Sequence, residues 1–173
     1  KLKLKIWRDK KEIDVAVPMK VRGEDSNIGN LYDAPPRYFV FAGLVFTPLT
    51  LDYVKTFGRN WRGVANSEMI YELYYRRNET PAKVRKEPVV LATTLAHAVN
   101  ADMRLASRAM IDTINGKRIE SLEDVIAAFE DNKKPQHMIQ FISGTVECLD
   151  NTRAELANPE ILSTYGIQAD RRL

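Results

Sequence analysis

The chain has 173 residues, of which 45% are hydrophobic and 28% charged, and its formal net charge is +3. A chain of this length can bury a core and needs no more than one domain with extensions. No apolar run approaches the roughly 20 residues that cross a bilayer, so the sequence predicts no membrane-spanning segment.

Lysine alternates with apolar side chains over residues 1–6, within a basic segment that comprises the first 22 residues. These 22 residues carry eight Lys or Arg against three Asp or Glu. The alternation predicts a β-hairpin with one solvated face, whose charges resist aggregation. Nucleic-acid binding is the alternative, but a basic end without interleaved aromatic residues is a weak footprint for it.

A linker with Gly and Pro, residues 23–36, precedes an aromatic, β-branched run that predicts one strand over residues 38–49. Gly43 lies inside it, where glycine usually marks a bulge or the close approach of another backbone. One interpretation is a nest of N–H groups that holds a carboxylate, formed by Ala42, Gly43, Leu44, Val45 and Phe46. The other is a buried strand in which Gly43 relieves crowding.

Residues 51–86 are expected to be largely helical, with helices over residues 51–57 and 67–76 and a break before Pro81. A strand over residues 88–97 follows. The helical stretch is rich in aromatic residues, which protein interfaces favour, although a satellite core would use them equally. The candidate interface residues are Tyr53, Phe57, Trp61, Tyr71, Tyr74 and Tyr75.

The segment 110–130 has the clearest local signals. Asn115-Gly116 tolerates positive φ at both positions and predicts a tight hairpin. Ser121 is a candidate N-cap for a helix with an anionic first turn. The helix has an apolar face at helical spacing, formed by Leu122, Val125, Ile126 and Phe129.

The last third of the chain predicts two more strands, over residues 136–143 and 145–149. The only cysteine, Cys148, is expected to be a small core residue in the second strand. A short helix is expected to begin near Asn151 and to end at Asn158-Pro159. The final residues are expected to fray, with docking of the tail in a groove as the alternative.

In this order, the segments resemble the circularly permuted PDZ domains of the HtrA/Deg serine proteases. GLVF (43–46) looks like the carboxylate-binding loop of that family, INGKRI (114–119) like its hairpin, and SLEDVIAAF (121–129) like its groove-lining helix. Residues 38–50 and 161–173 are similar to the second PDZ domain and tail of plant-type Deg proteases and their bacterial relatives. Residues 2–17 resemble the last strands of a preceding PDZ domain.

The resemblance implies an α+β, mainly β fold: a partly open β-barrel or sandwich capped by helices, with an N-terminal β-hairpin. It divides the chain into a terminal hairpin of a preceding PDZ domain (1–22), the linker (23–36), a PDZ-like domain (37–157) with a helical insertion (51–86), and a tail (158–173). In a peptide-reading domain, Ala42 to Phe46 would hold a C-terminal carboxylate. Leu122, Ile126 and Phe129 would line the pocket for the last side chain.

The sequence predicts no catalytic site. His97 follows Thr-Leu-Ala, which is similar to the context of the trypsin-like histidine, but no serine lies in a GNSGG-like context, and a nucleophile needs both a base and an oxyanion hole. His97, His137 and Cys148 are too scattered to form a metal cluster. We therefore expect no metal or cofactor. The resemblance to Deg proteases implies that a protease domain would lie upstream of residue 1.

Two functions from different classes follow. The first is a non-catalytic regulatory and assembly region of a Deg-type protease, which contacts other domains or subunits of the same protease and forms homo-oligomers in the full-length protein. The second is a module that binds apolar C-terminal peptides of substrates or partners. Pro48 weakens the second, because it lacks the N–H that a strand-adding peptide needs. Neither function involves nucleic acid or membrane. The family occurs in bacterial envelopes and in plant organelles and nuclei, so the compartment stays unknown, with the bacterial periplasm or envelope favoured.

Overall fold

The structure is a computed structural model that describes residues 1–19, 29, 34–104 and 108–173. Most of the expected linker lies outside the described residues. The strands are β1 (Leu2–Arg8), β2 (Lys11–Val17), β3 (Tyr38–Phe41), β4 (Leu44–Pro48), β5 (Val89–Thr94), β6 (Ala109–Ile114), β7 (Lys117–Arg118), β8 (Gln136–Phe141), β9 (Val146–Asp150) and β10 (Arg171–Arg172). The helices are α1 (Leu51–Lys55), α2 (Trp61–Val64), α3 (Ser67–Tyr74), α4 (Arg76–Glu79), the 3₁₀ helix η1 (Pro81–Lys83), α5 (Leu122–Glu130) and α6 (Asn151–Thr164).

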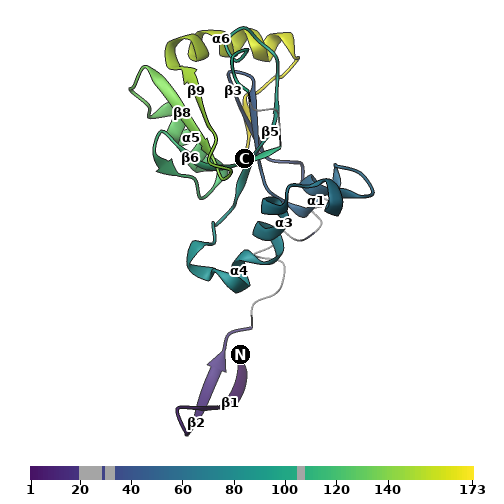
Figure 1. Cartoon of the computed structure of the whole chain (residues 1–173), viewed down its shortest axis with the longest axis vertical. Helices are drawn as coiled ribbons and strands as arrows, with labels where there is room; N and C mark the ends of the chain where they lie inside the picture. The colour runs from purple at the N-terminus through teal and green to yellow at the C-terminus, as the bar shows by residue number, and fades with distance from the viewer. Residues whose placement is uncertain (20–28, 30–33, 105–107) are drawn as a thin grey trace.

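Eight of these strands form one antiparallel sheet, in the order β10-β3-β4-β5-β6-β8-β9, with β7 paired to β6. The strands β1 and β2 form a separate hairpin, which Figure 1 shows apart from the large sheet. The predicted α+β, mainly β fold with an N-terminal hairpin is confirmed.

The large sheet carries apolar side chains on both faces. Along β5, Val89 and Leu91 belong to the main core beneath α5, whereas Val90 belongs to a second cluster beneath α1–α3. The same alternation separates Met110 from Ile111 on β6. Because successive side chains of a strand point to opposite faces, β5 and β6 each contribute buried side chains to both clusters.

The local signals around α5 are confirmed. Asn115 and Gly116 have φ values of 55° and 83° and form the β6–β7 turn. The side chain of Ser121 accepts a hydrogen bond from the backbone N–H of Asp124 and caps α5. The apolar face of this helix is buried in the main core.

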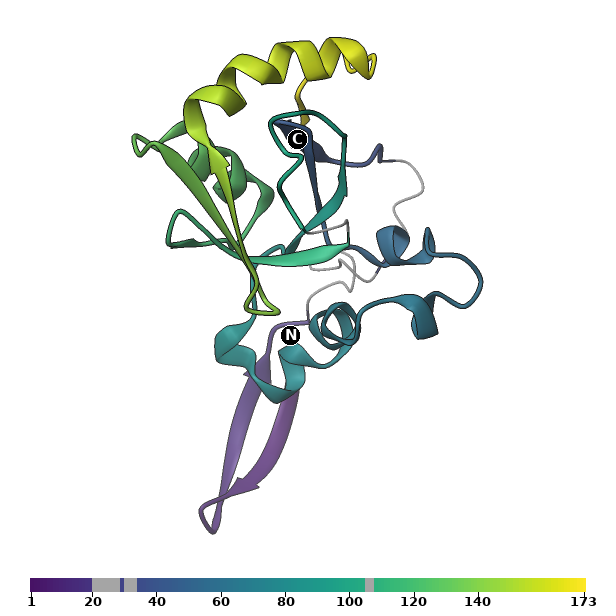
Figure 2. The same cartoon turned by 45° about the horizontal axis from the view of Figure 1, so that its top comes forward.

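Four predictions from the sequence are wrong. The final residues do not fray, because Arg171 and Arg172 pair with β3 as strand β10. The run 38–49 is not one strand, because the chain reverses at Ala42-Gly43 and forms the antiparallel pair β3–β4. The helix from Asn151 does not end at Pro159 but continues to Thr164, and Figure 2 shows it as one continuous helix across the top of the fold. Cys148 lies on β9 but is exposed rather than in the core.

The hairpin β1–β2 has one apolar face and one polar face. Its register pairs Leu2 with Val17 and Leu4 with Val15, and these side chains share a face that remains partly exposed to solvent. On the other face Lys5 forms an exposed ion pair with Glu12, with 2.8 Å between nitrogen and oxygen. In the part of the chain that the structure describes, no helix is both long and apolar enough to cross a bilayer.

Candidate protein-docking site

The Ala42-Gly43 turn lies at the centre of the candidate site. Its two residues have φ values of 49° and 84°, which reverses the chain between β3 and β4. A Cβ on Gly43 would lie 2.4 Å from the carbonyl oxygen of Leu95. A side chain is therefore excluded at this position by the close approach of another backbone.

The Ala42 N–H and the carbonyl oxygens of Ala42 and Gly43 form hydrogen bonds within the chain. The Ala42 N–H donates to Asn158 Oδ1 on α6 at 2.8 Å. Asn100 Nδ2 donates to the carbonyl oxygens of Ala42, at 2.8 Å, and Leu95, at 2.9 Å. The Leu95 N–H donates to the Gly43 carbonyl at 2.7 Å. The turn is thus held by residues that are far from it in sequence.

The strand that follows the turn is paired along both edges. β4 pairs with β3 on one side and with β5 on the other. β3 therefore takes the edge of β4 where an added peptide strand would lie. The predicted ladder-breaking residue, Pro48, is the last residue of β4 and is aligned with Val89.

The helix α5 packs against this hairpin through aromatic rings. The ring of Phe129 lies 4.7 Å from that of Phe41, 6.1 Å from that of Phe39 and 5.6 Å from that of Phe46, measured between centroids. Leu122, Ile126 and Phe129 are all at least 94% buried. Of the sequence-predicted peptide-site residues, the structure brings Ala42, Leu44, Phe46, Leu122, Ile126 and Phe129 together in the main core. Val45 is half-buried and lies outside this core. The rings that contact Phe129 come from both β3 and β4.

A hairpin turn at a glycine, a strand after it and a helix packed alongside form the framework of a peptide-recognition domain. The family model of the PDZ domain matches residues 28–172. The chain belongs to the PDZ domain family. A search of curated proteins found no match.

Members of this family bind proteins or peptides, and no catalytic domain is found in the chain. Among the described residues, no cluster of three or more His, Cys, Asp and Glu side chains is placed to hold a metal ion. His97 is half-buried, and its ring lies 3.8 Å from a carboxylate oxygen of Glu160.

The aromatic residues of the insertion 51–86 separate into two groups. Trp61 is buried in the second cluster, and Tyr53, Phe57 and Tyr74 pack against it. Burial raises the pKa of Tyr53 to about 12, although the nearby charge of Arg108 opposes this. Tyr71 and Tyr75 instead stack on each other, with 6.3 Å between ring centroids, and line a shallow groove together with Arg62 and Arg76.

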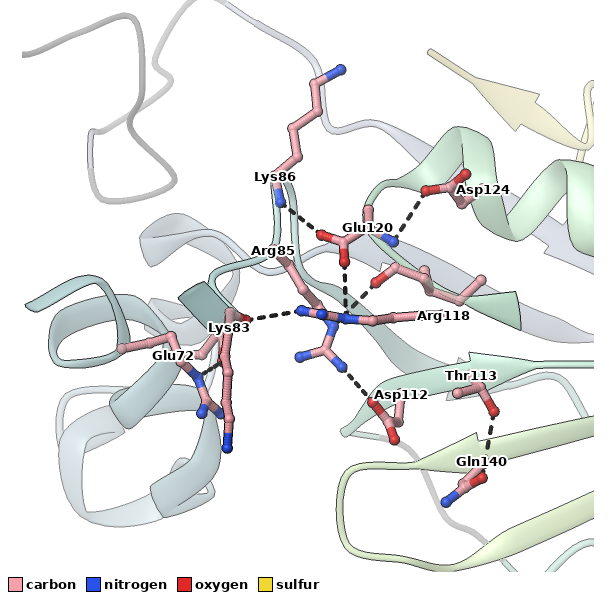
Figure 3. A network of polar contacts seen from close by, with 12 residues as sticks. Glu72, Lys83, Arg85, Lys86, Asp112, Thr113, Arg118, Glu120, Asp124 and Gln140 are labelled. Carbon is pink, nitrogen blue, oxygen red and sulfur yellow. Dashed lines mark hydrogen bonds and ion pairs between the residues drawn. The ribbon is translucent and has the colours of Figure 1, made fainter. Parts of the chain in front are cut away.

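The insertion is fixed to the PDZ core by a polar network (Figure 3). The buried Arg85 donates through Nε to the Ile119 carbonyl at 3.1 Å and forms an ion pair with Asp112 on β6. Arg118 donates to the Lys83 carbonyl at 2.9 Å and pairs with Glu120 at 2.9 Å. These contacts hold the end of the insertion against the β6–β7 hairpin.

A buried histidine, unremarkable in the sequence, joins four segments behind the aromatic cluster. His137 is fully buried, and its Nδ1 lies 3.2 Å from Asn115 Nδ2 and 3.0 Å from Asn132 Nδ2. Its Nε2 lies 2.9 Å from Asn151 Oδ1. Because amide nitrogens can only donate, Nδ1 accepts and Nε2 carries the proton. Desolvation lowers the pKa of His137, against the opposing effects of Asn151 and Glu155.

Proposed function

We propose that this PDZ domain acts as a non-catalytic docking and assembly region, of the kind that Deg-type serine proteases carry after their catalytic domain. Its partners would be other domains or subunits of the same protein, in a homo-oligomer. The observation that carries the proposal is the pairing of β4 on both edges, since a conventional PDZ ligand adds a strand at that position.

The hydrogen bond of the Ala42 N–H supports the same conclusion. A nest binds a carboxylate through N–H groups that have no other acceptor. Here the Ala42 N–H already has an acceptor in Asn158. A ligand carboxylate would therefore have to displace an internal hydrogen bond as well as strand β3.

The rigidly attached insertion provides the surface for docking. Tyr75 is 52% exposed and stacks on Tyr71 beside Arg62. Aromatic residues and arginine are the types that protein interfaces favour. The Deg-type context itself rests on the sequence resemblance, and an upstream GNSGG-containing domain in the parent gene would support it. A complete gene that begins near Lys1 would contradict it.

A fluorescence titration tests whether the pairing of β3 with β4 excludes peptide ligands. Labelled peptides with free apolar C-termini are titrated with the chain, and amidated versions serve as controls. We expect no saturable binding at micromolar concentrations. Micromolar binding that disappears on amidation would instead establish the second function, a peptide-reading module in which Ala42 to Phe46 hold the carboxylate and β3 moves aside.

A further inference from the structure

The end of the chain forms a strand on the outer edge of β3. Arg171 is aligned with Phe39 and Arg172 with Tyr38, in antiparallel register. The Val40 N–H donates to the Asp170 carbonyl at 2.6 Å, and the Tyr38 hydroxyl donates to the Ala169 carbonyl at 3.1 Å. This short strand, β10, is the terminal strand of the sheet.

The side chain of Arg171 is held by contacts from two elements. Its guanidinium carbon lies 5.1 Å from the centroid of Phe39, and Nη1 lies 2.8 Å from Glu130 Oε1 at the end of α5. Hydrogen bonds to Asp170 and then to Glu130 hold the pKa of Arg171 above its ordinary value. An aromatic face next to a carboxylate is a site that selects arginine over other side chains.

The backbone edge and the arginine site together define a ligand class. Main-chain pairing with β3 accepts any extended segment, and the Phe39–Glu130 pair adds a requirement for arginine at one position. Arg172 contributes little to this selection, since its guanidinium carbon lies 5.5 Å from the Tyr38 ring and the residue is exposed.

The contacts of the tail, residues 170–173, are few enough for it to detach reversibly from β3. It pairs with β3 over only two residues, and Leu173 beyond it is 60% exposed. Its connection to α6 passes through Gly166, whose φ of 66° ends the helix. A covalently tethered segment has an effective concentration in the millimolar range, so even a weak intrinsic affinity keeps it in place.

We propose that the outer edge of β3 is a strand-addition site for extended segments with an arginine opposite Phe39, and that residues 170–173 occupy it in cis and gate it. The site differs from a conventional PDZ groove in two respects. It uses β3 rather than the strand after the glycine turn, and it recognises a guanidinium rather than a terminal carboxylate. It therefore does not depend on the proposed assembly function.

The experiment uses the full chain with its own tail displaced. In the Arg171→Glu chain, the side-chain carboxylate introduced at position 171 faces Glu130. Repulsion between these two carboxylates should release the tail from β3. A fluorescent, C-terminally amidated peptide with the sequence of residues 165–173 is titrated into this variant and into the unmodified chain. We expect saturable binding to the variant and binding at least about tenfold weaker to the unmodified chain, whose tethered tail competes.

A charge exchange tests the arginine requirement. The Glu130→Arg chain also releases its tail, because Arg171 then faces a cation. It should bind a peptide that carries glutamate in place of Arg171 and reject the original peptide, whereas the Arg171→Glu chain should show the reverse preference. With two variants, the test remains possible if one of them fails to fold. Circular dichroism checks that each variant chain is folded.

Two outcomes would overturn the proposal. One is a folded host that binds neither peptide, and the other is a host that binds both peptides equally. Neither result bears on the groove at Ala42 to Phe46, since the amidated probe has no C-terminal carboxylate. Failure of this site and failure of the proposed function are therefore separate results.

Discussion

At the scale of one residue, a substitution of Gly43 tests whether the close approach of the Leu95 backbone to the turn contributes to stability. In Gly43→Ala, the new Cβ would meet the Leu95 carbonyl at 2.4 Å, and φ is +84°. Because the obstacle is backbone rather than a flexible side chain, we expect a loss of about 3 kcal/mol or more in the free energy of unfolding. Urea denaturation measures this loss.

Gly116 is the matched control for this substitution. Its φ of +83° is almost the same, but a Cβ there would meet no atom of the described residues within 4 Å. Gly116→Ala should therefore report the backbone strain alone, about 1 kcal/mol. Equal losses in the two variants would show that the Leu95 carbonyl moves aside and that the close approach has no energetic weight.

At the scale of elements, the attachment of the insertion depends on a buried charge. The Arg85 side chain is 6% exposed and its ion-pair partner Asp112 is 35% exposed. Asp112→Ala should cost about 2–4 kcal/mol, because it leaves a guanidinium largely out of water without its counter-charge. Urea denaturation of the variant, followed by far-UV circular dichroism, measures the difference.

Two further variants separate the buried charge from a general effect of charge removal. Lys117→Ala breaks a partly exposed pair between the neighbouring hairpin and Asp124 on α5, so it should change stability by less than about 1 kcal/mol. The double variant Arg85→Met/Asp112→Leu removes both charges and should recover most of the loss. If Asp112→Ala is no worse than Lys117→Ala, the network does not anchor the insertion.

The elements that the sequence predicts well are those with local causes. The Asn-Gly turn and the Ser121 cap depend on residues within a few positions of each other. The Ala-Gly turn does not, because alanine is a poor residue for a φ of 49° and gives no turn signal. Asn100 and Asn158 hold that turn, and their contribution is visible only once the chain has folded.

The same reasoning explains the other differences. Proline ends helices in general, but α6 continues past Pro159. Asn158, which lies within α6, accepts a hydrogen bond from the Ala42 N–H. β10 depends on a contact with β3, about 130 residues earlier in the chain. The sequence therefore indicated which residues of the turn and of α5 lie close together, whereas their role as a peptide site stays a prediction. Their arrangement was not predictable, since one unrecognised turn decides whether β4 has a free edge.

On the scale of the whole molecule, the buried His137 makes stability depend on pH. Its neighbours come from the β6–β7 turn, the end of α5 and the start of α6. Protonation would place an N–H at Nδ1 opposite two amide donors in a dry environment. The folded pKa lies below 6.5, so the unfolded chain binds the proton first as the pH falls.

The free energy of unfolding should therefore be constant above about pH 7 and should fall below about pH 6.5 by at most about 1.4 kcal/mol per pH unit. It should level off once the pH is below the folded pKa. Glu123 and Asp124 have pKa values below their ordinary values despite partial burial, so their contributions are lost at more acid pH. Urea denaturation at intervals between pH 7.5 and about pH 5 therefore measures the contribution of His137 to the free energy of unfolding separately from those of the two carboxylates. His137→Gln should be less stable at neutral pH but should lack the slope, and a variant that kept the full slope would assign the acid sensitivity to another group.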